Sequence, residues 1–296
     1  MKQHAVHPIL FAVLAAVFYA VSTPCSKLLL RHIGPTMLAA FLYLGAGAGM
    51  AVLGGVRRRG KEQPLTRREL PYTIGMIVLD IAAPVFLMIG LQYTTAANAS
   101  LLNNFEIVAT SVIALAVFHE AISRRLWIAI VLVTLSSLLL SIEDSSSFSF
   151  SIGSLFVLAA CVCWGLENNC TRMMSQKDPL EIVIIKGFCS GFGSLLLGIA
   201  VGESLPQMTY LLLTMLLGFV AYGLSIYFYV YAQRELGAAK TSAYYAIAPF
   251  VGAGLSLLLF RQLPSESFLL ALLLMLAGAY LAATEETTAE TEPPSA

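Results

Sequence analysis

The sequence predicts an all-α integral membrane protein whose ten transmembrane helices form two inverted five-helix repeats. Three observations predict it: an apolar composition, ten long apolar runs and an internal repeat. Of the 296 residues, 58% are apolar and 11% are charged, whereas soluble domains have about 25% charged residues. Such a chain has too few polar side chains to cover a water-exposed surface. The composition therefore argues against a soluble globular domain, a disordered protein and a nucleic-acid partner.

The apolar runs are each close to the length of about 20 residues that a membrane-spanning helix needs. They are too long and too uniformly apolar for the alternating strands of a membrane β-barrel. Turn-forming pairs such as Gly34-Pro35 and Asp178-Pro179 separate several of them. The predicted spans are 8–30, 36–56, 71–92, 95–118, 125–142, 152–173, 180–201, 208–231, 238–260 and 267–284.

The positively charged residues predict the orientation of these spans. Most of the 17 Lys and Arg residues lie on one side, at the N-terminus and in the loops after spans 2, 4, 6 and 8. The opposite side carries Lys27, Arg31 and Arg261. Because Lys and Arg concentrate in cytoplasmic loops, we expect both termini in the cytoplasm and a location in the cytoplasmic membrane. The acidic, proline-containing segment 285–296 is predicted to be a disordered cytoplasmic tail.

An internal repeat relates the two halves of the chain. The segment FAVLAAVFYAVSTPCSK, which begins at Phe11, matches FVLAACVCWGLENNCTR, which begins at Phe156, with an offset of 145 residues. A second match pairs AANAS at Ala96 with AAKTS at Ala238, with an offset of 142. The two units cover 1–142 and 152–284. Since each unit has an odd number of spans, the units must be inverted relative to each other, which is typical of alternating-access transporters.

Several motifs identify a family resemblance. The segment GLQYTTAANASLL from Gly90 to Leu102, the pair Trp164-Gly165, and the segment from Ala248-Pro249 to Phe260 resemble EamA-type repeats of the drug/metabolite transporter superfamily. The resemblance covers nearly the whole chain. It implies a secondary transporter, and specifically an exporter, of small organic metabolites such as amino acids, amines or drug-like solutes. It also implies a central cavity lined by spans 1, 3, 4, 6, 8 and 9.

The chain departs from the family pattern in the fourth span of each unit. Glu106 is followed by Ile107 instead of the common proline, whereas Pro249 is preceded by Ala248 instead of an acid. The two halves have diverged, so we expect the coupling or substrate chemistry to lie mainly in one of them.

Four ionisable residues fall inside predicted spans: Asp80, Glu106, Glu167 and Lys186. A charge at mid-membrane costs about 2.5–3.5 kcal/mol, so it normally faces a cavity or a partner. The acids are accompanied by amides that can hydrogen-bond a polar solute, namely Asn103, Asn104 and Asn168. We predict that these acids and amides bind substrate and that Lys186 is an internal counter-ion. A carboxylate in low dielectric takes up a proton readily, so Glu106 and Glu167 are candidates for proton coupling.

The alternative for Glu106 and Glu167 is a structural ion pair with Lys186, Lys27 or Arg172. For Glu167 both interpretations stay open because Arg172 lies five residues further on. They also stay open for Asp80, which precedes Pro84. We favour function for Glu106, because it is central in its span and has no base nearby in the sequence.

Aromatic residues form the second candidate group. Tyr19 and Trp164 occupy matched positions in the two units, and Tyr222, Tyr244 and Tyr245 lie in spans 8 and 9. Aromatic rings beside carboxylates suit organic cations, as well as aromatic solutes. The alternative for these rings is helix packing or an interfacial belt.

The competing functions are an integral-membrane enzyme and a passive channel for small polar solutes. The sequence has no HExxH, GxSxG or P-loop motif, and its five cysteines lack metal-ligand spacing. We therefore predict a non-enzymatic transporter without a metal or cofactor. Its expected partners are a small-molecule substrate, the lipid bilayer and, as a hypothesis, protons; the oligomeric state is left open.

Overall fold

The computed structural model describes residues 6–56, 63–118, 123–144, 149–174, 177–236 and 244–289. In the first repeat the helices are α1 (Val6–Ala20), α2 (Ser22–Leu29), α3 (Pro35–Val56), the 3-10 turn η1 (Arg67–Glu69), α4 (Leu70–Tyr93), α5 (Ala96–Leu102), α6 (Phe105–Phe118) and α7 (Arg124–Ser141). In the second they are α8 (Ile152–Arg172), α9 (Pro179–Ile185), the π-turn η2 (Lys186–Ser190), α10 (Gly191–Ala200), α11 (Met208–Gly218), the π-turn η3 (Phe219–Leu224), α12 (Ser225–Leu236), α14 (Ala248–Phe260) and α15 (Glu266–Ala289).

Eight helical segments of the described chain are long and apolar enough to cross a membrane. They correspond to the first eight predicted spans. Two shorter apolar helices, Ala248–Phe260 and Glu266–Ala282, fall where spans 9 and 10 are predicted. Part of predicted span 9, residues 238–243, lies outside the described residues. The chain is therefore a helical, multi-pass membrane protein, and the number of ten spans stays a prediction.

Two local features differ from an all-helical chain with a disordered tail. A short antiparallel pair, β1 (Ile142–Asp144) and β2 (Ser149–Phe150), joins the two repeats. Helix α15 continues to Ala289, so the beginning of segment 285–296 is helical in the structure. Glu and Ala are good helix formers, which lets the last span extend past its apolar part. Residues 290–296 lie outside the described residues.

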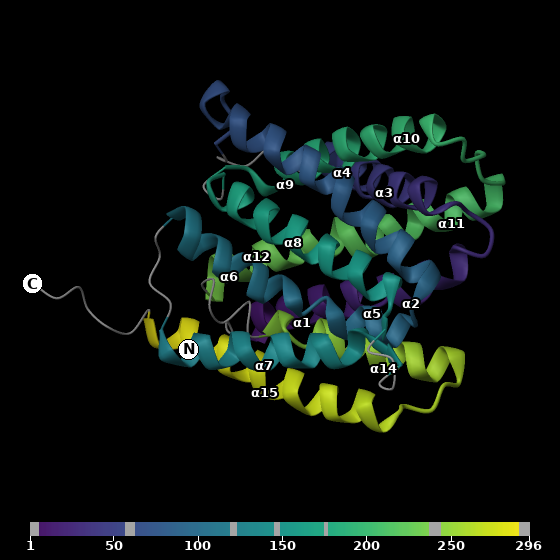
Figure 1. The fold of residues 1–296 in the computed structure, drawn as a ribbon. Helices are drawn as coiled ribbons and strands as arrows, with labels where there is room; N and C mark the ends of the chain where they lie inside the picture. The colour runs from purple at the N-terminus through teal and green to yellow at the C-terminus, as the bar shows by residue number, and fades with distance from the viewer. Residues whose placement is uncertain are drawn as a thin grey trace, which may run out of the picture.

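The two repeats interlock. Helix α4 packs along α8, α1 along α12, and α7 along α15, and each of these pairs joins the first repeat to the second. Figure 1 shows α7 and α15 running side by side at one edge of the bundle. Helix α3 contacts α10 and α11, and α5 contacts α14. Neither repeat therefore buries its helix faces without the other.

Close helix crossings around α3 depend on glycines. A Cβ atom on Gly218 of α11 would overlap the backbone of Leu42, and one on Gly187 of η2 would overlap the backbone of Gly47. Glycine lets helix backbones approach at such crossings, as is common in membranes. These contacts hold the seventh and eighth spans directly against α3.

A carboxylate of the second repeat caps a helix of the first. Glu203, between α10 and α11, accepts hydrogen bonds from the backbone N–H groups of Thr36 (3.1 Å) and Met37 (2.8 Å) at the start of α3. We expect Glu203→Ala to destabilise the protein by about 1 kcal/mol, the typical value of a lost cap. Thermal unfolding of the purified protein measures this. Gln207→Ala is the control, since Gln207 is exposed in the same loop and its side chain caps nothing. Equal melting temperatures for both variants would contradict the prediction.

Candidate functional site

The fourth span is broken in its middle. Asn103 and Asn104 form a turn between α5 and α6, held by short-range bonds from the Glu106 N–H to the Asn103 carbonyl (3.1 Å) and from the Ile107 N–H to the Asn104 carbonyl (3.1 Å). Asn has a low helix propensity, which favours a break at this pair. Glu106 consequently lies in the first turn of α6, where the helix dipole favours a carboxylate.

The ninth span has a corresponding turn. Ala246 and Ile247 form a turn directly before α14, and the repeat offset of 142 residues aligns Asn104 with Ala246. Helices α5 and α14 pack against each other, so the two interrupted spans meet between the repeats. Discontinuous helices at a repeat interface are where transporters of inverted-repeat architecture place their binding sites.

Glu106 accepts a hydrogen bond from an amide and, within the described residues, has no ion-pair partner. The Asn168 side chain donates to Glu106 Oε1 (2.6 Å) and also lies 3.3 Å from the Thr110 hydroxyl. Among the residues that the structure describes, no Lys or Arg forms an ion pair with Glu106. Glu106 is partly exposed, so its carboxylate is open to a further partner.

The side-chain amides of Asn103 and Asn104 at the break can form further hydrogen bonds. Asn103 and Asn104 are 6% and 2% exposed. Asn103 Oδ1 and Asn104 Nδ2 have no hydrogen-bond partner within the described part of the chain. Buried polar atoms without partners cost free energy, so an unpaired acceptor and an unpaired donor beside Glu106 favour the binding of a polar solute.

Aromatic rings from three spans lie beside this break. The Tyr19 ring centroid is 6.0 Å from that of Tyr222 and 5.8 Å from that of Tyr245. Glu106 is near enough to Tyr19 and Tyr245 to interact with them electrostatically. Tyr244, by contrast, is 36% exposed and does not take part in these ring contacts. The tyrosines and Glu106 together offer a cation a carboxylate and aromatic faces.

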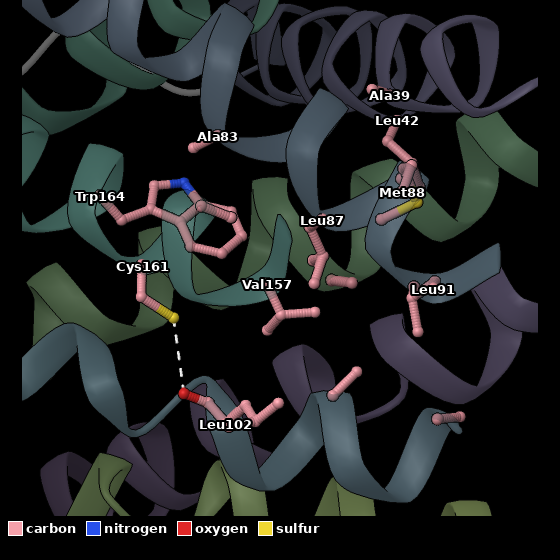
Figure 2. Packing of buried hydrophobic residues seen from close by; sticks show 14 of the residues in the cluster. Ala39, Leu42, Ala83, Leu87, Met88, Leu91, Leu102, Val157, Cys161 and Trp164 are labelled. Carbon is pink, nitrogen blue, oxygen red and sulfur yellow. Dashed lines mark hydrogen bonds between the residues drawn. The ribbon is translucent and has the colours of Figure 1, made fainter. Parts of the chain in front are cut away.

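Trp164 is 6% exposed and belongs to the main apolar core, as does Tyr222. Figure 2 shows Trp164 among Ala83, Leu87 and Val157, with Cys161 one turn earlier on α8. The Cys161 thiol lies 3.5 Å from the Leu102 carbonyl at the end of α5, where the interrupted helix leaves carbonyl groups to satisfy. Packing is therefore the role of Trp164 that the geometry favours.

The other three buried charges form a separate cluster. Lys186 Nζ lies 3.1 Å from Asp80 Oδ2 and 3.0 Å from Glu167 Oε1. The Tyr43 hydroxyl donates to Asp80 Oδ1 (3.0 Å), and the Thr171 hydroxyl donates to Glu167. We call these residues the Lys186 cluster. Asp80 and Glu167 are 0% and 2% exposed, whereas the Lys186 side chain is 12% exposed, so the carboxylates are buried and the lysine is partly accessible.

Two π-turns contain one residue each of the Lys186 cluster and of the tyrosine group beside the break. Lys186 begins η2, and Tyr222 lies in η3. A π-turn inserts a residue into the helical spacing and is often found at functional sites. It changes which side chains face inward, so neither position follows from a regular helical pattern. Tyr43 has no distinguishing signal in the sequence either, because it lies within an apolar span.

A pocket of about 560 Å³ lies elsewhere, between the end of α4, the start of α5 and the start of α15. Its lining includes Lys27, Thr95 and Ser265, and none of the predicted binding residues. Lys27 donates to the carbonyls of Leu91 and Thr94 (2.8 Å for Thr94). These carbonyls lie at the C-terminal end of α4, where the helix dipole stabilises a cation. Lys27 thus contacts helix carbonyls instead of the buried acids. Within the described residues no group of three or more His, Cys, Asp or Glu could hold a metal ion.

These features define a class: a multi-pass helical membrane protein with two interlocked repeats and polar residues buried between them. The chain belongs to the EamA-like transporter family, whose model matches residues 7–142 and 151–284. The resemblance to EamA-type repeats is thereby confirmed.

Similar proteins agree with this assignment. An uncharacterized transporter of Methanothermobacter thermautotrophicus is 25% identical over 286 residues, which cover 90% of this chain and 83% of that protein. The uncharacterized transporter YyaM of Bacillus subtilis is 22% identical over 254 residues, or 80% of each protein. A solved crystal structure with 18% identity superimposes with a TM-score of 0.66 and covers 97% of this chain and 99% of that one. That likeness concerns the fold alone.

Proposed function

We propose that this protein is a secondary active transporter that moves small organic metabolites across the cytoplasmic membrane by alternating access. The observation that carries the proposal is Glu106, a carboxylate without an ion-pair partner among the described residues, at the meeting point of two interrupted spans. The family resemblance favours export, and the distribution of Lys and Arg favours a cytoplasmic location for both termini.

The chemistry of the break favours an amine-bearing solute. An ammonium group pairs with the Glu106 carboxylate and with the unpartnered Asn103 Oδ1, and it is attracted by the rings of Tyr19 and Tyr245. The unpartnered Asn104 Nδ2 donates to a carbonyl, hydroxyl or carboxylate of the same solute. Amines and amino acids fulfil both requirements.

Contacts between the repeats at opposite ends of the bundle support alternating access. At one end Glu203 binds the start of α3. At the other end the Asp178 N–H donates to the Gln63 carbonyl (2.9 Å), and the Leu65 N–H donates to Glu181 (3.0 Å). Two repeats joined by small polar contacts at each end are suited to opening one end at a time.

Counterflow in liposomes tests the proposal against the two alternatives. Proteoliposomes are loaded with an unlabelled amine or amino acid, selected by its stabilisation of the purified protein against heat, and diluted into a trace of the labelled compound. A carrier produces transient accumulation that saturates with concentration. A passive channel produces equilibration without accumulation, and an enzyme produces a new compound without net solute movement; either result would overturn the proposal.

A further inference from the structure

We propose that the Lys186 cluster is the binding site of a coupling proton, separate from the solute site at Glu106. This inference rests on the transporter function proposed above. It assigns the proton to the pair Asp80 and Glu167, whose carboxylates share one lysine.

The charge count of the cluster carries the first step. Two carboxylates, Asp80 and Glu167, face a single ammonium group, Lys186, at 3.1 and 3.0 Å. With all three ionised the cluster has one excess negative charge. Asp80 and Glu167 are almost completely buried, and an uncompensated buried charge costs several kcal/mol. One proton shared by the two carboxylates makes the cluster neutral.

Within the part of the chain whose side chains are described, which does not include the side chain of Arg172, no further Lys or Arg forms an ion pair with the cluster. The titratable groups that face the cluster from neighbouring elements are Tyr43 on α3, Cys170 on α8, Tyr222 on η3 and Glu106 on α6. Of these, Glu106 adds further negative charge. On other elements packed nearby, Glu181 binds the Leu65 N–H and Lys27 binds the carbonyls that end α4. Since no described side chain compensates the excess negative charge of the cluster, we infer that a bound proton does.

The Lys186 cluster also spans the boundary between the two repeats. Asp80 and Tyr43 belong to the first repeat, and Glu167 and Lys186 belong to the second. A carboxylate beside an ammonium group holds a proton less tightly than one without it. A movement of the repeats that separates Lys186 from Asp80 therefore changes how tightly the cluster binds its proton. A binding affinity that differs between the two conformations is what couples an ion gradient to transport.

Glu106 has a different role in this scheme. It is partly exposed, binds a neutral amide, and lies beside the unpartnered Asn103 and Asn104. A neutral substitution of Glu106 removes the negative charge that pairs with the ammonium group of the solute. A neutral substitution of Asp80 or Glu167 instead leaves one carboxylate opposite Lys186. This remaining ion pair has no net charge, so it needs no bound proton.

The experiment compares Asp80→Asn and Glu167→Gln in the same proteoliposomes, each assayed for counterflow and for transport driven by a pH gradient. We expect both variants to lose gradient-driven transport by about tenfold or more relative to their own counterflow in the same vesicles, because the coupling free energy disappears with the titrating site. Proton release on solute binding, followed with a pH indicator in detergent, should disappear in both. Cys170→Ser is the control, since it faces the cluster without changing its charge count.

Two independent variants keep the proposal testable if one of them does not fold. Gradient-driven transport by a folded Asp80→Asn or Glu167→Gln protein at the wild-type level would overturn it. So would a wild-type protein that shows counterflow but no response to a pH gradient, a result that leaves the carrier function intact. Absence of counterflow from the wild type would instead contradict the proposed transport function itself.

Discussion

Glu106→Gln is expected to reduce solute counterflow strongly at solute concentrations that half-saturate the wild type, while the protein stays folded. The variant keeps the size of the side chain and its contact with Asn168 but removes the negative charge that pairs with an ammonium group. A hydrogen bond to a charged group contributes about 1.5–3 kcal/mol, so we expect solute binding to weaken by about 10- to 100-fold. Counterflow in proteoliposomes and ligand-induced thermal stabilisation both measure the change.

The matched control for this variant lies on the same helix. Ser111→Ala removes a hydroxyl that bonds only to the Ile107 carbonyl one turn earlier, so transport should remain near the wild-type rate. If Glu106→Gln transports as well as Ser111→Ala, Glu106 does not bind the solute. The proposal for the break in span 4 would then lose its main support.

Gly218→Ala should destabilise the fold strongly, although it adds only a single methyl group. The new Cβ would overlap the backbone of Leu42, and backbone atoms cannot rotate out of the way as a flexible side chain can. Overpacking typically costs about 1–3 kcal/mol, and we expect the upper part of this range. A lower melting temperature and a lower yield of monodisperse protein would report it.

Gly254→Ala makes the same chemical change where there is room. Apart from the adjacent backbone of its own helix, no atom of the described residues lies within 4 Å of a Cβ built on Gly254 of α14, and Ala is preferred to Gly in a helix by about 0.5–1 kcal/mol. This variant should melt at or slightly above the wild-type temperature. A Gly218→Ala protein that melts at the same temperature as Gly254→Ala and the wild type would show that the α3–α11 crossing tolerates a methyl group, contrary to the structure.

The spans and the repeat can be predicted because both are local properties of the sequence. Uninterrupted apolar runs locate the first eight spans whatever their neighbours are. The match of Phe11 with Phe156 compares the chain only with itself. The interruptions differ from the prediction: the apolar pattern predicts a continuous span over 95–118, although the pair Asn103-Asn104 is a visible signal for a break. The π-turns at Lys186 and Tyr222 have no such signal, since they depend on the helices packed against them.

The members of the candidate site can be predicted, but their grouping cannot. Asp80, Glu106, Glu167 and Lys186 stand out in the sequence because a charge within a membrane is costly. The same reasoning leaves Lys186, Lys27 and Arg172 as alternative partners of the acids. In the structure Lys186 pairs with Asp80 and Glu167, whereas Lys27 binds the end of α4. Among the described side chains, Glu106 has the amide of Asn168 as its partner, and the side chain of Arg172 lies outside the described residues.

The sequence by itself thus determined that this is a multi-pass membrane protein of two related halves, and which few charges it carries inside its spans. The cost of burying apolar or charged groups is a property of each residue, so it can be read without the fold. Only the tertiary structure decided which charges meet. That depends on the rotation and crossing of helices from different repeats, which the close contacts of Gly187 and Gly218 with α3 and the two π-turns set.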